Sequence, residues 1–295
     1  MAAAAGFLLW GIVPIYWKQM HAVSAIELIA HRIVWSLLLL IAVLAWQNRF
    51  TDLRAGFSST RAVGLNLLSG LLLAANWTVY VWAVNSGHIL ESSLGYFLTP
   101  LCNVALGYFF LGERLRLMQW FAIACAAIGV GFLLFGVGRF PGIALSLAGT
   151  WSSYSLLKKK SPLGPLTGLT VETMLLFPIA ASYLLWLQSV GQGALGRVDA
   201  WHHGLILSVG AVTAIPLLLF AYGAQRIRFV TLGLLQYLAP TVQFLIGLLI
   251  YRETFIPAQM RAYGLIWCGL AIYTADALLT QRTNFLRRAS NRPTN

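Results

Sequence analysis

Charged side chains are scarce in this sequence. Asp, Glu, Lys and Arg together make up 9% of its 295 residues, whereas a soluble domain carries about 25%. Hydrophobic residues make up 59%, and apolar runs of about 20 residues, long enough to cross ~30 Å of hydrocarbon, recur along the chain. So few charges cannot cover a water-facing surface. We therefore expect an all-α integral membrane protein surrounded by the lipid bilayer.

Motifs for catalysis and for resident cofactors are missing as well. The three cysteines lie inside apolar runs and lack the spacing of metal ligands or of a disulfide framework. The sequence contains neither the GxxxxGK[ST] motif of an ATP-driven motor nor an HExxH zinc motif. Ser152, Ser153 and Ser155 have no histidine in the neighbouring apolar segments to activate them. We expect no enzyme activity, no cofactor and no metal site.

Turn residues and charges divide the chain into ten apolar segments. The first, AAAAGFLLWGIVPIYW, has no basic residues before it, so we expect a membrane span and not a cleavable signal. The ten predicted transmembrane helices cover about residues 2–19, 26–46, 62–85, 89–111, 117–137, 140–157, 165–187, 204–224, 229–251 and 259–280.

Lysines and arginines are distributed unevenly between the two sides of these segments. With the N-terminus inside the cell, 14 of the 20 fall on the cytoplasmic side, with Lys158, Lys159 and Lys160 among them, and 5 fall on the opposite side. This bias follows the positive-inside rule, so both termini are predicted to be cytoplasmic. It also explains the net charge of +12 without nucleic acid as a partner. Only Arg32 remains inside a span.

Two parts of the chain resemble each other. SLGYFLTPLCNVALGYFFLGERL aligns with TLGLLQYLAPTVQFLIGLLIYRETF, and the aligned pairs lie 140 residues apart: Pro100 with Pro240, Gly107 with Gly247 and Glu113 with Glu253. The duplication divides the chain into two halves of five spans, 1–138 and 139–295. Because five is odd, the halves have inverted topology, an arrangement typical of secondary transporters with a solute site near the bilayer midplane.

The paired prolines and glutamates are candidates for the hinges and gates of a conformational change. Pro100 and Pro240 each remove one backbone hydrogen bond in mid-span and are predicted helix hinges; the alternative is the ordinary tolerance of proline in membrane helices. Glu113 and Glu253 are expected at the membrane interface, as candidate gate contacts.

The segment ELIAHRIVWS places a charge inside the second span. A basic side chain there costs at least ~2.5–3.5 kcal/mol, so Arg32 should face protein or water and have a partner. The offset of 140 maps Arg32 onto Glu172. We expect both to line a central cavity, where they hold a solute carboxylate and a solute amine or proton, or pair through water. The alternative is an ion pair that locks the two halves together.

Other polar side chains accompany this pair. Glu27, His31 and Trp35 share one helix face, and a histidine beside a carboxylate is a candidate proton relay, with a proton as the coupling ion. The alternative for His31 is an ordinary hydrogen-bonding group. A second cluster suits an organic solute, unless its members only join helices to one another; it contains Asn76, Trp77, Tyr80, Tyr96, Asn103, Gln236, Tyr237 and Gln243.

Several stretches together resemble one transporter family. They are WGIVPIYWK (10–18), ELIAHRIVWS (27–36), NWTVYVWAVNSGHILESSLGYFLTPL (76–101), LGERL (111–115) and TLGLLQYLAP (231–240). Over nearly the whole chain they are similar to the RarD branch of the EamA-type drug/metabolite transporters, often called chloramphenicol-sensitivity proteins. The resemblance implies a ten-helix permease or exporter of the bacterial inner membrane, built from two EamA repeats. One departure is that the Gly112–Glu113 pair becomes Arg252–Glu253 in the second copy.

The function predicted from these features is secondary transport of a small organic metabolite or drug by alternating access. The alternative is a non-transporting polytopic membrane protein with a structural or partner-binding role. The sequence leaves the solute, the coupling ion and the oligomeric state open.

Overall fold

The chain is a bundle of helices. The computed structural model describes residues 1–20, 23–135, 140–252 and 257–290, and within these ranges it contains twelve helices and no strand. The helices are α1 (Ala2–Trp17), α2 (Ala25–Trp46), α3 (Phe50–Phe57), α4 (Thr60–Asn85), α5 (Ile89–Leu111), α6 (Leu117–Phe135), α7 (Gly142–Lys160), α8 (Pro165–Ser189), α9 (Ala200–Arg226), α10 (Phe229–Leu235), α11 (Leu238–Leu249) and α12 (Pro257–Ser290).

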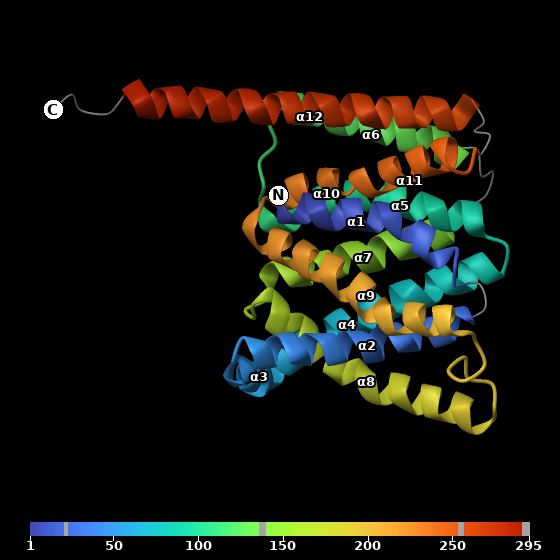
Figure 1. The fold of residues 1–295 in the computed structure, drawn as a ribbon. Coiled ribbons are helices and arrows are strands. Elements are labelled where there is room, and N and C mark those ends of the chain that lie inside the picture. The colour runs from blue at the N-terminus through green and yellow to red at the C-terminus, as the bar shows by residue number, and fades with distance from the viewer. Residues whose placement is uncertain (21–22, 136–139, 253–256, 291–295) are drawn as a thin grey trace.

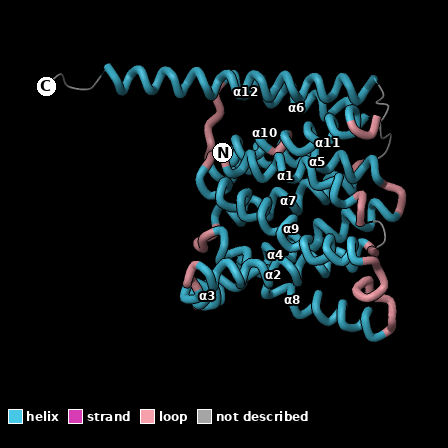
Figure 2. Tube along the Cα trace, viewed as in Figure 1, coloured by secondary structure: helices cyan, strands magenta, loops and turns pink. Residues whose placement is uncertain are grey.

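The long helices run side by side, and the loops gather at the two ends of the bundle (Figure 1, Figure 2). The N-terminus, α3 and the end of α12 lie at one end, which we call the α3 end. The connection from α8 to α9 lies at the other, which we call the α8–α9 loop end. The last turns of α12 extend beyond the bundle at the α3 end.

The helices of the first and second halves pack against one another in a reciprocal pattern. α5 packs on α7 while α1 packs on α11, and α2 packs on α9 while α4 packs on α8. α1 contacts α9 while α4 contacts α7. Three further contacts join α2 with α8, α5 with α10, and α6 with α12. Most of the bundle's core is therefore built between the halves.

The contact between α6 and α12 is close enough to require glycine on both sides. A Cβ added to Gly129 would lie 2.8 Å from the carbonyl oxygen of Ala262, and one added to Gly269 would lie 2.5 Å from that of Ala122. Each residue of the first contact lies 140 positions from its counterpart in the second. Small residues let the backbones of membrane helices approach in this way.

Eight helices of the described chain are long and apolar enough to cross a membrane. α1 is apolar but shorter, and α7 carries four serines and three lysines. Large apolar side chains remain exposed around the bundle, for example Phe109, Ile179 and Leu249 at 70–76% exposure. Such a surface suits lipid and not water. Helices occupy all ten predicted ranges, although only eight meet the length and composition of a span.

The predicted ninth span, 229–251, is interrupted. α10 ends at Leu235 and α11 begins at Leu238, two residues before Pro240. Pro240 has no N–H to donate to the carbonyl of Gln236, which accepts instead from the Ala239 N–H at 3.2 Å. α5 continues through Pro100 without a break. Of these two prolines, only Pro240 therefore lies beside an interruption of the helix.

The predicted end of the sixth span was wrong. We expected the helix to stop near residue 157 and Lys158 to lie in a cytoplasmic loop, but α7 runs to Lys160. Lys158 is 2% exposed and Lys159 is half-buried, whereas Lys160 is exposed. The physical reason is that both buried lysines have partners on other helices. The short helix α3, which lies between α2 and α4, was not predicted either.

Candidate functional site

Arg32 lies among aromatic side chains from other helices. Its guanidinium carbon is 3.9 Å from the ring centroid of Trp77 on α4 and 5.2 Å from that of Trp17 at the end of α1. Its Nε donates a hydrogen bond to Thr213 Oγ1 on α9 at 3.1 Å. No carboxylate of the described chain is recorded within 4 Å of this guanidinium. Arg32 is thus held by cation–π contacts and a neutral hydroxyl.

Two tyrosines extend this aromatic surround. Tyr80 on α4 and Tyr96 on α5 pack edge to face, with ring centroids 5.8 Å apart, and both lie near Arg32. Tyr80 is 37% exposed and Tyr96 is 43% exposed. We call Trp17, Trp77, Tyr80 and Tyr96 the aromatic wall.

A small cavity separates Arg32 from Glu172. Its volume is about 20 Å³, which is room for about one water molecule. Twelve residues of α2, α4, α8 and α9 line it. Ten of them form five pairs whose members lie 140 positions apart: Arg32 with Glu172, Ile33 with Thr173, Ser36 with Leu176, Leu73 with Thr213, and Trp77 with Leu217. Corresponding positions of the two halves therefore line the same cavity.

Glu172 forms an ion pair with Lys158. Lys158 Nζ lies 2.6 Å from Glu172 Oε1, and the two side chains are 3% and 2% exposed. The ring of Tyr154 lies 5.6 Å from the same ammonium. Arg32 and Glu172 share a cavity, but the partner of Glu172 is a lysine on α7 that the sequence had assigned to a loop.

Glu27, His31 and Trp35 face away from this cavity, toward the α8–α9 loop end. Glu27 Oε1 accepts a hydrogen bond from the backbone N–H of Ala194 at 2.6 Å, and His31 Nε2 lies 3.7 Å from the same carboxylate. Trp35 packs against an apolar cluster that includes Leu205. Glu27 also lines an open cavity of about 800 Å³ at the α8–α9 loop end.

Most polar residues of the predicted second cluster form hydrogen bonds between helices at separate places. Asn76 Nδ2 on α4 donates to the carbonyl of Leu147 and to Thr150 Oγ1 on α7, both at 2.9 Å. The remaining contacts are Asn103 Nδ2 to Gln236 Oε1 at 3.0 Å, Tyr237 Oη to the carbonyl of Phe97 at 3.1 Å, and Gln243 Nε2 to the carbonyl of Trp10 at 3.3 Å. Of this cluster, only Trp77 lines the cavity between Arg32 and Glu172.

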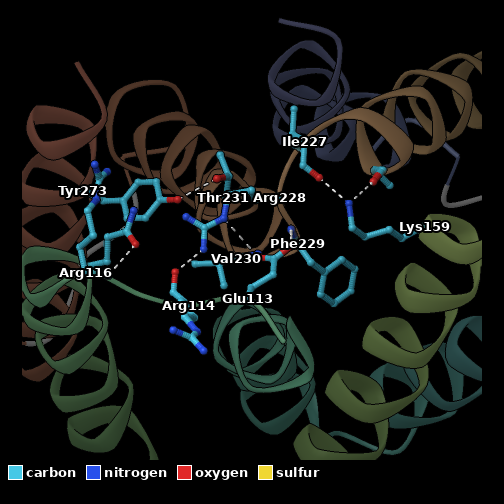
Figure 3. Close-up of polar contacts among 12 residues, drawn as sticks. Glu113, Arg114, Arg116, Lys159, Ile227, Arg228, Phe229, Val230, Thr231 and Tyr273 are labelled. Atoms are coloured by element: carbon cyan, nitrogen blue, oxygen red, sulfur yellow. Dashed lines mark hydrogen bonds and ion pairs between the residues drawn. The ribbon is translucent and has the colours of Figure 1, made fainter. Parts of the chain in front are cut away.

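Glu113 connects the two halves at the α3 end (Figure 3). Gly112 ends α5 with φ +63°, which turns the chain so that Glu113 reaches α10. Its Oε1 accepts from the Phe229 N–H at 2.6 Å, and its Oε2 accepts from the Val230 N–H at 3.0 Å. Arg228 Nε lies 3.8 Å from Oε2. Glu253, the predicted counterpart, lies outside the described residues.

Lys159 makes a second connection at this end, beside Glu113 in Figure 3. Its Nζ donates to the carbonyl oxygens of Ala224 at 3.2 Å and of Ile227 at 2.6 Å, at the end of α9. A cation at the C-terminus of a helix is favourable because the last carbonyls have no partners within the helix.

Comparison with known proteins places the chain in a family. The EamA-like transporter family matches residues 1–135. The protein named Protein RarD of Streptomyces exfoliatus is 41% identical over 286 residues, which cover 97% of this chain and 91% of that protein. The chain belongs to the RarD branch of the EamA-type transporters. A further relative, from Vibrio cholerae serotype O1, is named Uncharacterized transporter and is 40% identical over 279 residues, 94% of this chain and 92% of that protein.

The RarD-branch assignment predicted from the sequence is thus confirmed, and the chain is a multi-pass membrane protein of a transporter family. A solved crystal structure has the same fold, with a TM-score of 0.70, and covers 93% of this chain and 96% of its own. Its sequence identity of 22% makes this a likeness of fold alone.

Sequence reasoning missed several residues of this RarD-branch site. Lys158 was hidden in a run of three lysines that resembles a topological signal. Trp17 and Thr213 lack charge and resemble ordinary membrane-helix residues. For Lys159, a basic residue in the last turn of a helix was an available signal. No group of three His, Cys, Asp or Glu that could hold a metal occurs in the described part of the chain.

Proposed function

We propose that this chain is a secondary transporter that moves a small organic solute across the bacterial inner membrane by alternating access. It is built from ten spans in two inverted repeats, 1–138 and 139–295, with both termini in the cytoplasm. The α3 end is then the cytoplasmic end. The reciprocal helix contacts and the glycine contacts between α6 and α12 support the two repeats, because a two-fold relation exchanges the partners in each pair.

One observation carries this proposal: the cavity between Arg32 and Glu172 is lined by corresponding positions of both halves. Transporters with inverted repeats place their solute site at the interface of the repeats, near the midplane. Ionisable groups inside a membrane are costly and mark solute or ion pathways. Arg32, Trp77 and Glu172 are the central residues of the proposed site, and Tyr96 belongs to its aromatic wall.

The size of the cavity favours alternating access over an open channel. A volume of about 20 Å³ holds one water, whereas pockets for small organic molecules measure about 300–1,000 Å³. The helices around Arg32 must therefore separate to admit a solute. Pro100 and Pro240 are the proposed hinges, and the break beside Pro240 is where α10 and α11 can change their relative orientation.

Closing contacts join the halves at both ends of the bundle. At the α3 end Glu113 holds the first amides of α10. At the α8–α9 loop end Glu27 holds the Ala194 N–H, and Glu91 Oε1 accepts from the Ile143 N–H at 2.9 Å. Opening one end requires breaking the contacts of that end while the contacts of the other remain.

A proton is the proposed coupling ion. Glu172 is buried beside the cavity with a titratable partner, and His31 lies near a carboxylate that faces the open cavity at the α8–α9 loop end. Asn76, Asn103, Gln236, Tyr237 and Trp35 are proposed to hold the helices around the site.

The test is uptake into proteoliposomes containing the purified full chain. Radiolabelled amino acids, organic acids and amines are screened with and without a pH gradient. We expect saturable uptake of at least one of them, strongly reduced by Arg32→Lys and Glu172→Gln and unchanged by Lys160→Gln, which alters an exposed lysine of α7. The absence of any uptake above empty liposomes, with folded protein inserted, would support the non-transporting alternative.

A further inference from the structure

We propose that the solute is an organic monoanion, a carboxylate attached to a flat apolar group, and that Arg32 binds its carboxylate. This inference rests on the proposed transport function and specifies its solute class. The inference is based on two neighbouring groups. Within the described chain, Arg32 has hydrogen-bond donors without acceptors, and the charge of Glu172 beside it is already neutralised by Lys158.

The balance of charge around the cavity is the first argument. Arg32 on α2 and Glu172 on α8 line the cavity, and Lys158 on α7 forms an ion pair with Glu172. The tyrosines nearby, Tyr80 and Tyr154 among them, are neutral near pH 7. The opposite charges of Lys158 and Glu172 neutralise each other in their ion pair, with 2.6 Å between Nζ and Oε1. The positive charge of Arg32 remains without a counter-charge from the residues described. An uncompensated charge within a membrane span is costly, and one bound carboxylate makes the closed site neutral.

The geometry of the guanidinium is the second argument. Nε is occupied by Thr213, while Nη1 and Nη2 have no acceptor among the residues that the structure describes. These two nitrogens form the edge that binds a carboxylate through two parallel hydrogen bonds. Trp77 packs against the guanidinium carbon at 3.9 Å and fixes the plane of this edge. A planar oxyanion therefore meets donors that are already oriented.

The aromatic wall indicates what kind of group is attached to the carboxylate of the solute. Trp17, Trp77, Tyr80 and Tyr96 come from three helices and approach the same cation. Their rings offer stacking surfaces for a flat apolar group next to the carboxylate. This combination of apolar walls and one oriented polar anchor is that of a small-molecule site.

A cationic or zwitterionic solute fits less well. An ammonium group near Arg32 meets a like charge. Glu172 is the one carboxylate that lines this cavity in the described chain, and Lys158 already occupies it. An amine-bearing solute at Glu172 therefore meets a carboxylate that Lys158 already neutralises, whereas a carboxylate at Arg32 meets a cation that is unpaired among the described residues.

Equilibrium binding to the full chain in lipid nanodiscs tests this inference without requiring transport. The probes are radiolabelled benzoate, benzamide and benzylamine, which share a ring and differ in charge. We expect benzoate to bind and the other two not to bind at the same millimolar concentration. Hydrogen bonds to a charged group are worth about 1.5–3 kcal/mol, so Arg32→Gln should weaken benzoate binding by about tenfold or more.

Two variants keep the test informative. Arg32→Lys preserves the charge but not the two-donor edge, so it should weaken binding even if Arg32→Gln fails to fold. Lys160→Gln should leave binding unchanged. Benzylamine binding in preference to benzoate, no benzoate binding, or unaltered benzoate binding in both Arg32 variants would overturn the inference. Benzoate binding without flux of any solute would overturn only the transport proposal, and flux of a cationic solute would overturn only this one.

Discussion

Lys158 and Glu172 form an ion pair across two helices, with 2.6 Å between Nζ and Oε1 and with both side chains at most 3% exposed. Removing one partner of such a pair leaves the other charge buried, which costs about 3–5 kcal/mol, whereas replacing both by apolar residues is often neutral. The pair therefore behaves as a unit.

The first prediction follows from this coupling. Lys158→Met should lower the thermal unfolding midpoint in detergent markedly, and the double variant Lys158→Met/Glu172→Leu should recover most of the loss. Lys160→Met, two residues along the same helix, is the exposed control and should change little. A double variant as unstable as the single one would contradict this account.

The second prediction concerns closure at the α3 end. Glu113→Ala removes the acceptor of the Phe229 and Val230 amides, and charge-assisted bonds of about 1.5–3 kcal/mol should be lost. Hydrogen–deuterium exchange over residues 229–235 should become at least about tenfold faster. Glu113→Gln retains an acceptor and should be intermediate, and Arg114→Ala should not differ from the parent. Unchanged exchange in Glu113→Ala would show that the contact does not hold α10.

The third prediction uses a backbone correspondence. Gly112 has φ +63° and Arg252, 140 positions later, has φ +52°. A left-handed conformation costs a non-glycine residue about 1–2 kcal/mol. Arg252→Gly should therefore raise the free energy of unfolding by about 1 kcal/mol, measured by denaturant titration. Arg252→Ala removes the charge but keeps the Cβ, so equal stabilisation by both variants would assign the effect to charge.

The fourth prediction is a pH dependence outside the membrane. Asp199 caps α9, its Oδ1 accepting from the His202 N–H at 2.9 Å, and this hydrogen bond lowers the pKa of Asp199 below its ordinary 3.8. The cap is therefore fully present above pH 3.8 and is lost as the pH falls through the lowered native value. Amide protection in the first turn of α9 should fall with it. Asp199→Asn keeps a cap that does not titrate, so loss of protection in that variant too would exclude Asp199 as the cause.

The sequence predicted the helices better than it predicted the partners of individual side chains. The offset of 140 residues pairs Arg32 with Glu172, and both line one cavity. Lys158 was misplaced because a run of lysines at a span end looks the same whether its side chains snorkel to water or turn inward. Only the position of Glu172 on α8 decides between these outcomes.

The remaining errors have similar causes. A helix hinge was predicted at both Pro100 and Pro240, but the helix is interrupted only beside Pro240, and α5 continues through Pro100. Asn103 and Gln236 were grouped with a solute site, yet they bond to each other where α5 and α10 meet. An amide in an apolar span signals that a partner exists, but tertiary packing determines which partner it is.

Glu113 holds the second half by backbone amides and not by side chains. Every residue type except proline offers the same N–H, so this contact does not specify the side chains at positions 229 and 230, which are set instead by their burial in the apolar core. The contact with the two amides therefore depends on a single side chain of the first half, that of Glu113.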